Sequence, residues 1–151
     1  MNHSRRAALK TTGALATLVS LGVITQSQAQ AAVDRAAFDL KTLDDALKAV
    51  GGKPATSDQV TVVSPDIAEN GAVVPVGATS KLPNTTEIFL IVEKNPMPLS
   101  CGFTIPAGTV AEVQTRLKMG QSTNVIAVVK ADGKLYSATK ETKVTLGGCG
   151  G

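Results

Sequence analysis

The feature that most limits the fold is a spacing of two between apolar residues, which begins near residue 60 and continues to residue 146. Side chains at alternate positions of an extended chain point to the same face, so this period is typical of β-strands. Turn-forming residues interrupt it about every ten residues, as in β-sandwiches. Between the last two regular runs, Ala131-Asp132-Gly133 predicts a hairpin turn. We therefore expect strands at 60–64, 72–79, 87–93, 97–105, 113–119, 124–130 and 134–140, and a last extended segment at 141–146.

Roughly seven short strands predict an all-β chain with an immunoglobulin-like β-sandwich over residues 55–146. The sequence contains no tryptophan, so the prediction depends on strand number and pattern, without the cysteine–tryptophan–cysteine core of true immunoglobulin domains. Pro75 favours a sheet edge for its strand, because proline has no N–H to donate. The apolar run at 87–93 indicates a strand buried on both faces. One alternating set is expected to share an inward face: Met97, Leu99, Cys101, Phe103 and Ile105.

A short helix is expected before the strands, from Phe38 to Val50, within an N-terminal helical segment at residues 32–54. Its apolar residues recur at spacings of three and four, with charged residues between them, which is the pattern of an amphipathic helix. Gly51-Gly52 is expected to end the helix, and Pro54 prevents it from resuming.

The first 31 residues have the three parts of an export signal in order. Arg5 and Arg6 form a twin-arginine pattern, a weakly apolar stretch follows at residues 11–25, and Ala29-Gln30-Ala31 resembles a cleavage site. A frayed helix or a membrane anchor is the alternative interpretation. The signal predicts a folded chain exported by the twin-arginine route to the periplasm, an oxidising compartment in which an unpaired thiol needs a purpose.

Composition excludes several classes of function. The net charge of +3 comes from three residues of the signal, Arg5, Arg6 and Lys10. The rest of the chain has 12 basic and 12 acidic residues, so no basic surface for nucleic acid is expected. Beyond the signal, no apolar run is long enough for a membrane span. His3 is the only histidine and lies in the signal, which excludes histidine-dependent nucleophilic catalysis in the exported chain. We expect no metal site, no cofactor and no self-contained enzyme activity.

The last five residues, Gly147-Gly148-Cys149-Gly150-Gly151, are not explained by packing. Glycine buries almost no surface and loses the most entropy on ordering, so a flexible arm at residues 147–151 is expected. Three residues from Leu146 to Cys149 would reach about 10 Å. No cation neighbours Cys149 in the sequence, so its pKa is expected near the ordinary value of about 8.5. Activation of this thiol should therefore come from a partner.

A C-terminal cysteine can also serve other purposes. A prenylation signal needs four residues from the cysteine to the end, and only three are present. A structural disulfide between Cys101 and Cys149 is the serious alternative, although the inward position of Cys101 favours a buried thiol that packs as a small hydrophobe. A Cys149–Cys149 bridge between two chains, giving a homodimer, is a further resting or off-pathway state.

The terminal segment from Val144 to Gly151 resembles the C-terminus of the SoxY family, the thiosulfate carriers of the bacterial Sox sulfur-oxidation system. The stretch from Pro65 to Pro75 is similar to an early strand and loop of that family, and residues 124–129 to its penultimate hairpin. The resemblance implies that Cys149 is the covalent attachment point for sulfur intermediates, that Gly147, Gly148, Gly150 and Gly151 form the arm, and that catalysis belongs to partners.

The implied partners are a SoxZ-like subunit in a heterodimer, a haem-bearing SoxAX-like protein that attaches thiosulfate, a SoxB-like hydrolase and a SoxCD-like dehydrogenase. Cys101 departs from the single-cysteine pattern of the family. Two other classes of function remain as alternatives: a structural or adhesive sandwich clamped by a Cys101–Cys149 disulfide, and a thiol-based redox carrier without sulfur-compound chemistry.

Overall fold

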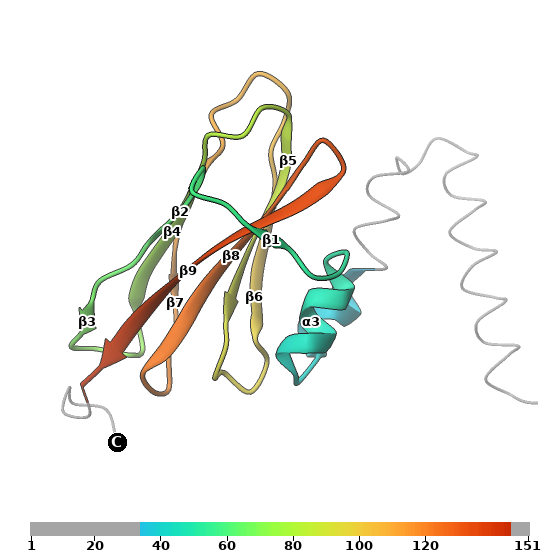
Figure 1. Cartoon of the computed structure of the whole chain (residues 1–151). Helices are drawn as coiled ribbons and strands as arrows, with labels where there is room; N and C mark the ends of the chain where they lie inside the picture. The colour runs from blue at the N-terminus through green and yellow to red at the C-terminus, as the bar shows by residue number, and fades with distance from the viewer. Residues whose placement is uncertain (1–33, 146–151) are drawn as a thin grey trace, which may run out of the picture. The chain divides into compact units, whose positions relative to one another are not determined.

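The computed structural model describes residues 34–145, which form two packed β-sheets and short helical segments (Figure 1). Chain contacts divide the protein into residues 1–36 and 37–151, and the fold described is that of the second unit. The predicted signal at residues 1–31 lies outside the described residues. The elements are η1 (Asp34–Asp39), α3 (Leu43–Ala49), β1 (Ala55–Thr56), β2 (Val60–Val63), β3 (Ile67–Ala68), β4 (Val74–Ser80), β5 (Thr85–Val92), β6 (Leu99–Thr104), β7 (Glu112–Leu117), β8 (Thr123–Ala131) and β9 (Lys134–Val144).

The larger sheet has the strand order β1-β9-β8-β5-β6, with the short β3 paired to β9, and the smaller sheet has the order β2-β4-β7. The predicted all-β sandwich with a short N-terminal helix is confirmed, and its seven longer strands lie where the alternation placed them. The segment expected at 141–146 is extended as far as Val144, but it continues the preceding strand, because β9 is one strand from Lys134 to Val144. No glycine or proline interrupts the sequence from Lys134 to Leu146, and the ladder with β8 continues to Thr142.

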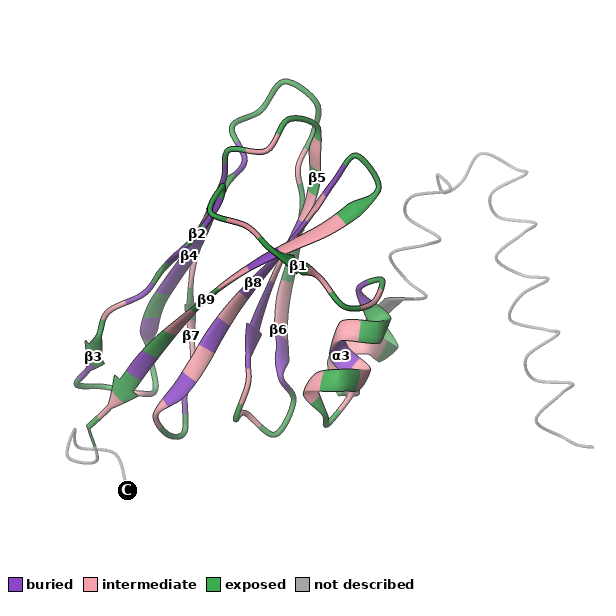
Figure 2. Ribbon diagram, in the orientation of Figure 1, coloured by how far each residue is buried: buried purple, intermediate pink, exposed green. Residues whose placement is uncertain are grey.

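Two apolar clusters fill the structure, one on each face of the larger sheet. The main cluster lies between the sheets and includes Ile88, Leu90 and Val92. The second includes Ile91 and Val128, which pack against Ala46 of α3. Figure 2 shows buried residues along strands of both sheets and within α3. The prediction that the run at 87–93 is buried on both faces is therefore confirmed, because the helix covers the outer face of β5.

The helix begins later than its periodicity predicts. Phe38 belongs to η1, and α3 begins after Thr42, whose side-chain oxygen accepts a hydrogen bond from the Asp45 N–H at 3.1 Å. This N-cap satisfies one of the free donors of the first turn, and a cap sets the start of a helix more strongly than apolar spacing does. The predicted end is confirmed, because Gly51 and Gly52 have φ of 125° and 115° and the Gly52 N–H donates to Leu47 O at 2.8 Å.

A β-bulge changes the predicted face of β6. Leu99 pairs with Ile91 whereas Cys101 pairs with Leu90, so Ser100 is an extra residue. Leu99 consequently packs in the helix-side cluster, while Cys101, Phe103 and Ile105 pack against the main core. Met97 lies before β6 and is 47% exposed. The single inward face predicted for these residues is therefore wrong for Met97 and Leu99.

Pro75 lies in the central strand of the smaller sheet, which is not the edge strand predicted. At the position of Pro75, β4 pairs with β7 alone, because the ladder between β2 and β4 ends at the Val63–Gly77 pair. Continuing that register would place Pro65 opposite Pro75, and neither residue has an N–H to donate. At the other hairpin the prediction is confirmed: Asp132 and Gly133 both have positive φ, 49° and 72°, as a two-residue turn between β8 and β9 requires.

Candidate functional site: the root of the C-terminal arm

The predicted arm residues Gly147, Gly148, Cys149, Gly150 and Gly151 lie outside the described residues, whereas the chain that leads to them is described as far as Thr145. These last described residues extend β9 beyond its ladder with β8, which ends at the Thr123–Thr142 pair. The site is therefore built from what holds residues 143–145, termed here the root of the arm.

Every backbone N–H of the root has a hydrogen-bond acceptor. The Lys143 N–H donates to Asp66 O at 2.9 Å and the Thr145 N–H donates to Ala68 O at 3.1 Å. These two bonds come from the parallel pairing of β3 with β9. Between them the Val144 N–H points to the other side and donates to Ser122 Oγ at 2.9 Å. Ser122 thus continues the β8 side of the ladder with a side chain after the backbone pairing has ended.

The segment that carries β3 is itself fixed to β9. The Lys140 ammonium donates to Ser64 O at 2.6 Å and lies 3.0 Å from a carboxylate oxygen of Asp66. The Thr142 hydroxyl, which is fully buried, donates to Ser64 Oγ at 2.9 Å. Because Asp66 is largely exposed, the ion pair itself contributes little, and the hydrogen bonds to Ser64 are the stronger part of this attachment.

Gly71 closes the loop after β3. Its carbonyl accepts a hydrogen bond from the Met119 N–H at 2.7 Å. A Cβ at position 71 would overlap the carbonyl oxygen of Met119 and lie 2.9 Å from a methyl of Val144, so only glycine fits. Met119 is buried and Val144 packs against the main core. The root is therefore held by hydrogen bonds on both edges and by side-chain packing beneath Val144.

Cys101, the second cysteine, is a free thiol in β6 and is half-buried against the main core. Burial raises the pKa of this thiol to about 11, and a backbone hydrogen bond with Leu90 opposes that shift only partly. The expectation that Cys101 packs as a small hydrophobe is confirmed. A neutral, half-buried thiol is a weak nucleophile, which leaves it poorly suited to carry a substrate.

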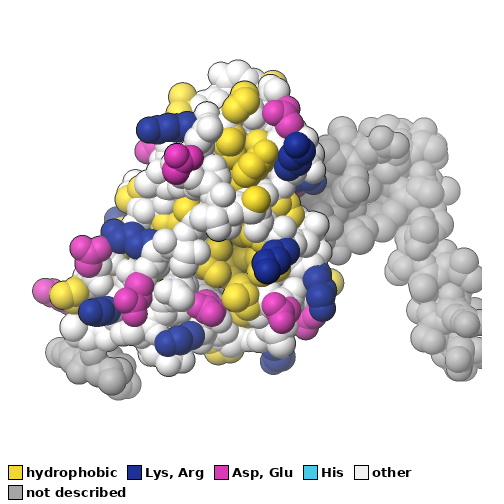
Figure 3. Space-filling model, in the orientation of Figure 1, with side chains coloured by type: hydrophobic (Ala, Val, Ile, Leu, Met, Phe, Trp, Pro, Cys, Tyr) yellow, Lys and Arg dark blue, Asp and Glu magenta, His cyan; other side chains and the backbone are white. Residues whose placement is uncertain are grey.

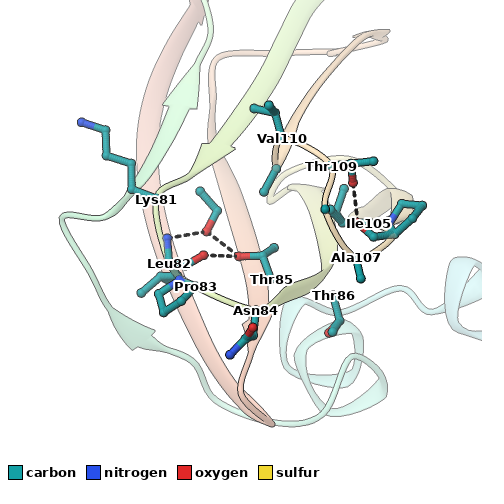
Figure 4. A pocket seen from close by; sticks show the side chains of 14 residues that line it. Lys81, Leu82, Pro83, Asn84, Thr85, Thr86, Ile105, Ala107, Thr109 and Val110 are labelled. Carbon is teal, nitrogen blue, oxygen red and sulfur yellow. Dashed lines mark hydrogen bonds between the residues drawn. The ribbon is translucent and has the colours of Figure 1, made fainter.

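A surface pocket lies at the other end of the sheets. It is formed by the loop after β4 and the loop after β6, and Figure 4 shows Lys81, Asn84 and Val110 around it. There the Ser80 and Thr85 hydroxyls lie 2.9 Å apart, and the Leu82 N–H donates to Ser80 Oγ at 3.2 Å. The pairing of β5, β8 and β9 places this pocket at the opposite end of the larger sheet from the root.

Charged side chains of both signs are interspersed over the face shown in Figure 3, around a central apolar area. The part of the chain from 34 to 145 contains no cluster of three or more histidine, cysteine, aspartate or glutamate side chains that could hold a metal ion. Within the same residues, no helix is long and apolar enough to cross a membrane.

Sequence reasoning missed the residues that hold the root: Ser64, Asp66, Gly71, Ser122 and Lys140. The resemblance of the stretch from Pro65 to Pro75 implies an early strand and loop, but it does not indicate contact with the C-terminal strand. Gly71 after Asn70 was the available signal, because such a pair indicates a turn. The bonds to Asp66 and Ala68 involve main-chain oxygens, which leave no mark on side-chain pattern.

Comparisons with known proteins agree with this architecture. The family model of the sulfur oxidation protein SoxY matches residues 46–149. Among solved structures, the chain is similar to the sulfur carrier protein SoxY from Chlorobium limicola f thiosulfatophilum, with 37% identity and a TM-score of 0.63 over 70% of this chain and 97% of that chain. It also resembles superoxide reductase (neelaredoxin) from Ignicoccus hospitalis, at 16% identity and a TM-score of 0.50, over 61% of this chain and 95% of that chain. The second likeness concerns the fold alone. A search of curated proteins gave no match.

Proposed function

The chain belongs to the SoxY family of sulfur oxidation proteins, and from that premise we propose that it carries thiosulfate-derived sulfur covalently on Cys149. The observation that carries the proposal is the root itself. The backbone N–H groups of the root are hydrogen-bonded as far as Thr145, and the sequence continues with Leu146, two glycines and a cysteine. The family match also ends on Cys149.

The proposed chemistry begins with oxidative loading. The Cys149 thiol and thiosulfate form a new sulfur–sulfur bond, giving the cysteine S-thiosulfonate, one proton and two electrons, and the electrons pass to a haem-bearing partner. A hydrolase then adds water across the sulfur–sulfonate bond, which releases sulfate and a proton and leaves a persulfide on Cys149. A dehydrogenase then oxidises the outer sulfur of the persulfide to a sulfonate, taking three oxygen atoms from three water molecules and passing six electrons to its acceptor with release of seven protons. Hydrolysis of that sulfonate releases sulfate and a proton and restores the Cys149 thiol. No cation neighbours Cys149 in the sequence to favour its thiolate, so the loading partner supplies the activation.

The location and partners belong to the same proposal. Export through the twin-arginine signal at residues 1–31 would place the carrier in the periplasm with the other Sox proteins. A SoxZ-like subunit is the proposed heterodimer partner, and SoxAX-, SoxB- and SoxCD-like proteins are the proposed loading and processing enzymes. The chain itself is a carrier and not an enzyme.

Strand register argues against the disulfide alternative. Cys101 pairs with Leu90, Leu90 with Ala127, and Ala127 with Ala138, so Cys101 lies level with Ala138 of β9. Thr145 is seven residues further along and three strands away, roughly 27 Å at about 3.3 Å per residue and 4.8 Å per strand. The four residues from Thr145 to Cys149 span at most about 14 Å. The Cα atoms of Cys101 and Cys149 would thus remain at least about 13 Å apart. The longest Cα–Cα distance across a disulfide is about 6.8 Å, so the bridge could form only if the root detached from the sheet.

The proposal is tested by thiosulfate-dependent electron flow in the reconstituted Sox system. Cys149→Ser should abolish it, while the matched variant Cys101→Ser should leave it unchanged, since the neutral thiol of Cys101 packs in the core and carries nothing. Electron flow that survives Cys149→Ser would favour the general redox carrier instead. No flow with the unaltered chain, together with a Cys101–Cys149 bridge, would favour the structural disulfide.

A further inference from the structure

We propose that Ser122 and the segment from Ser64 to Gly71 are positioning elements that fix the pivot of the arm at Thr145. This inference rests on the proposed carrier function and concerns how far and from where the thiol can be presented. It assigns a role to residues 64–71 and Ser122, which lie outside the predicted arm at residues 147–151.

The pivot follows from the hydrogen bonds of the root. The regular β8–β9 ladder ends at Thr142, and without further support residues 143–145 would be a frayed end. The three N–H bonds to Asp66 O, Ser122 Oγ and Ala68 O extend the ordered chain by those three residues. Cys149 is then four residues from a fixed point, whereas it would be seven residues from Thr142.

The two edges of the root are held differently. On the β3 edge, the acceptors are main-chain oxygens, and their place depends on the anchoring of Ser64 by Lys140 and Thr142. On the β8 edge, the support is one hydroxyl: Ser122 Oγ accepts from the Val144 N–H at 2.9 Å and lies 3.5 Å from Val144 O. Ser122 is therefore the point at which a single substitution weakens the root and leaves the backbone ladder intact.

The effect on transfer follows from arm length. The effective concentration of a tethered group falls roughly as the −3/2 power of tether length, and the volume within reach grows at most as its cube. Lengthening the free tether from four to seven residues therefore lowers the concentration of the thiol at a partner's channel by about two- to five-fold. On this proposal the substitution changes only the length of the tether, so the rate of Cys149 with a small reagent should stay the same.

The test uses the full exported chain, with Ser122→Ala as the releasing variant and Ser122→Thr as the conservative variant that keeps the hydroxyl. Ser80→Ala is the matched control, because Ser80 Oγ also accepts from a backbone N–H, that of Leu82, but at the opposite end of the sheet. Lys140→Gln is a second releasing variant, which removes the bond to Ser64 O on the β3 edge. Three quantities are measured: amide exchange at residues 143–145, kcat/KM for loading by the haem-bearing partner with thiosulfate, and the rate of Cys149 alkylation by iodoacetamide.

In Ser122→Ala we expect amide exchange at the root to be at least about three-fold faster, as for loss of one hydrogen bond. Loading should fall, by at most the two- to five-fold expected for a fully released root, with alkylation unchanged. Lys140→Gln should behave alike, Ser122→Thr should restore loading, and Ser80→Ala should change neither quantity. Faster exchange with unchanged loading overturns the proposal, and so does unchanged exchange or an equal loss of loading in Ser80→Ala. If the unaltered chain is not loaded on Cys149, the carrier function itself fails and the pivot falls with it.

Discussion

The two thiols of this chain should differ sharply in reactivity, and the difference can be worked out from their surroundings. Burial raises the pKa of Cys101 to about 11, whereas Cys149 is expected near 8.5. At pH 7.5 the thiolate fractions then differ by about 300-fold. The thiolate of higher pKa is intrinsically about 15-fold more nucleophilic, which reduces the ratio of rates to roughly 20-fold. Packing of Cys101 against the core limits access and makes the ratio larger.

The assay is a time course of alkylation with iodoacetamide at pH 7.5, in which peptides containing each cysteine are quantified by mass spectrometry. We expect Cys149 to be modified at least 20-fold faster than Cys101. The matched control is the same reaction in denaturing urea, where both thiols are solvated and the two rates should be similar.

Comparable rates for the two cysteines in the folded protein would refute this reasoning, because they would mean that Cys101 is neither desolvated nor shielded. Protection of both cysteines until a reductant is added would contradict it differently, by indicating the Cys101–Cys149 disulfide. Neither result is compatible with a free carrier thiol next to an inert core thiol.

Three further predictions concern stability. Gly71→Ala should lower the free energy of unfolding, measured in urea, by about 1–3 kcal/mol, because the new Cβ would overlap Met119 and Val144. The control Gly120→Ala places its Cβ in open space and should change this free energy by less than about 0.5 kcal/mol. Thr142→Val should lower that free energy by about 1–3 kcal/mol, because the buried Ser64 hydroxyl loses its partner, and the exposed Thr139→Val on the same strand should be nearly neutral. The free energy of unfolding should fall as the pH rises from about 9 to about 11, because the folded state keeps the Cys101 proton that the unfolded state has released. In urea titrations, Cys101→Ala should lack this part of the pH dependence.

The strands could be predicted from the sequence because their signal is local. Alternation in the runs around Val125 and Val113 depends only on which face is buried, and the Asp132–Gly133 turn needs residues that tolerate positive φ. The bulge at Ser100 could not be found in this way. Apolar residues continue at odd positions through Leu99 and Cys101, so the pattern shows no break where the pairing shifts.

The start of the helix and the root of the arm were missed for related reasons. The apolar spacing continues upstream of Thr42, and only the cap to Asp45 distinguishes the true first turn. At the root, two of the three acceptors are the carbonyl oxygens of Asp66 and Ala68, which any residue could supply. The third, Ser122, is one serine in a polar turn. Long-range pairing of this kind depends on the assembled sheet, which the sequence pattern does not specify.

The most direct test of the central claim is the mass of the Cys149 peptide in protein isolated without reductant after turnover with thiosulfate. The carrier account predicts sulfur-containing adducts, the S-thiosulfonate and the persulfide, on Cys149, together with an unmodified Cys101. A stoichiometric Cys101–Cys149 bridge, or a Cys149 that remains unmodified under turnover, would contradict it.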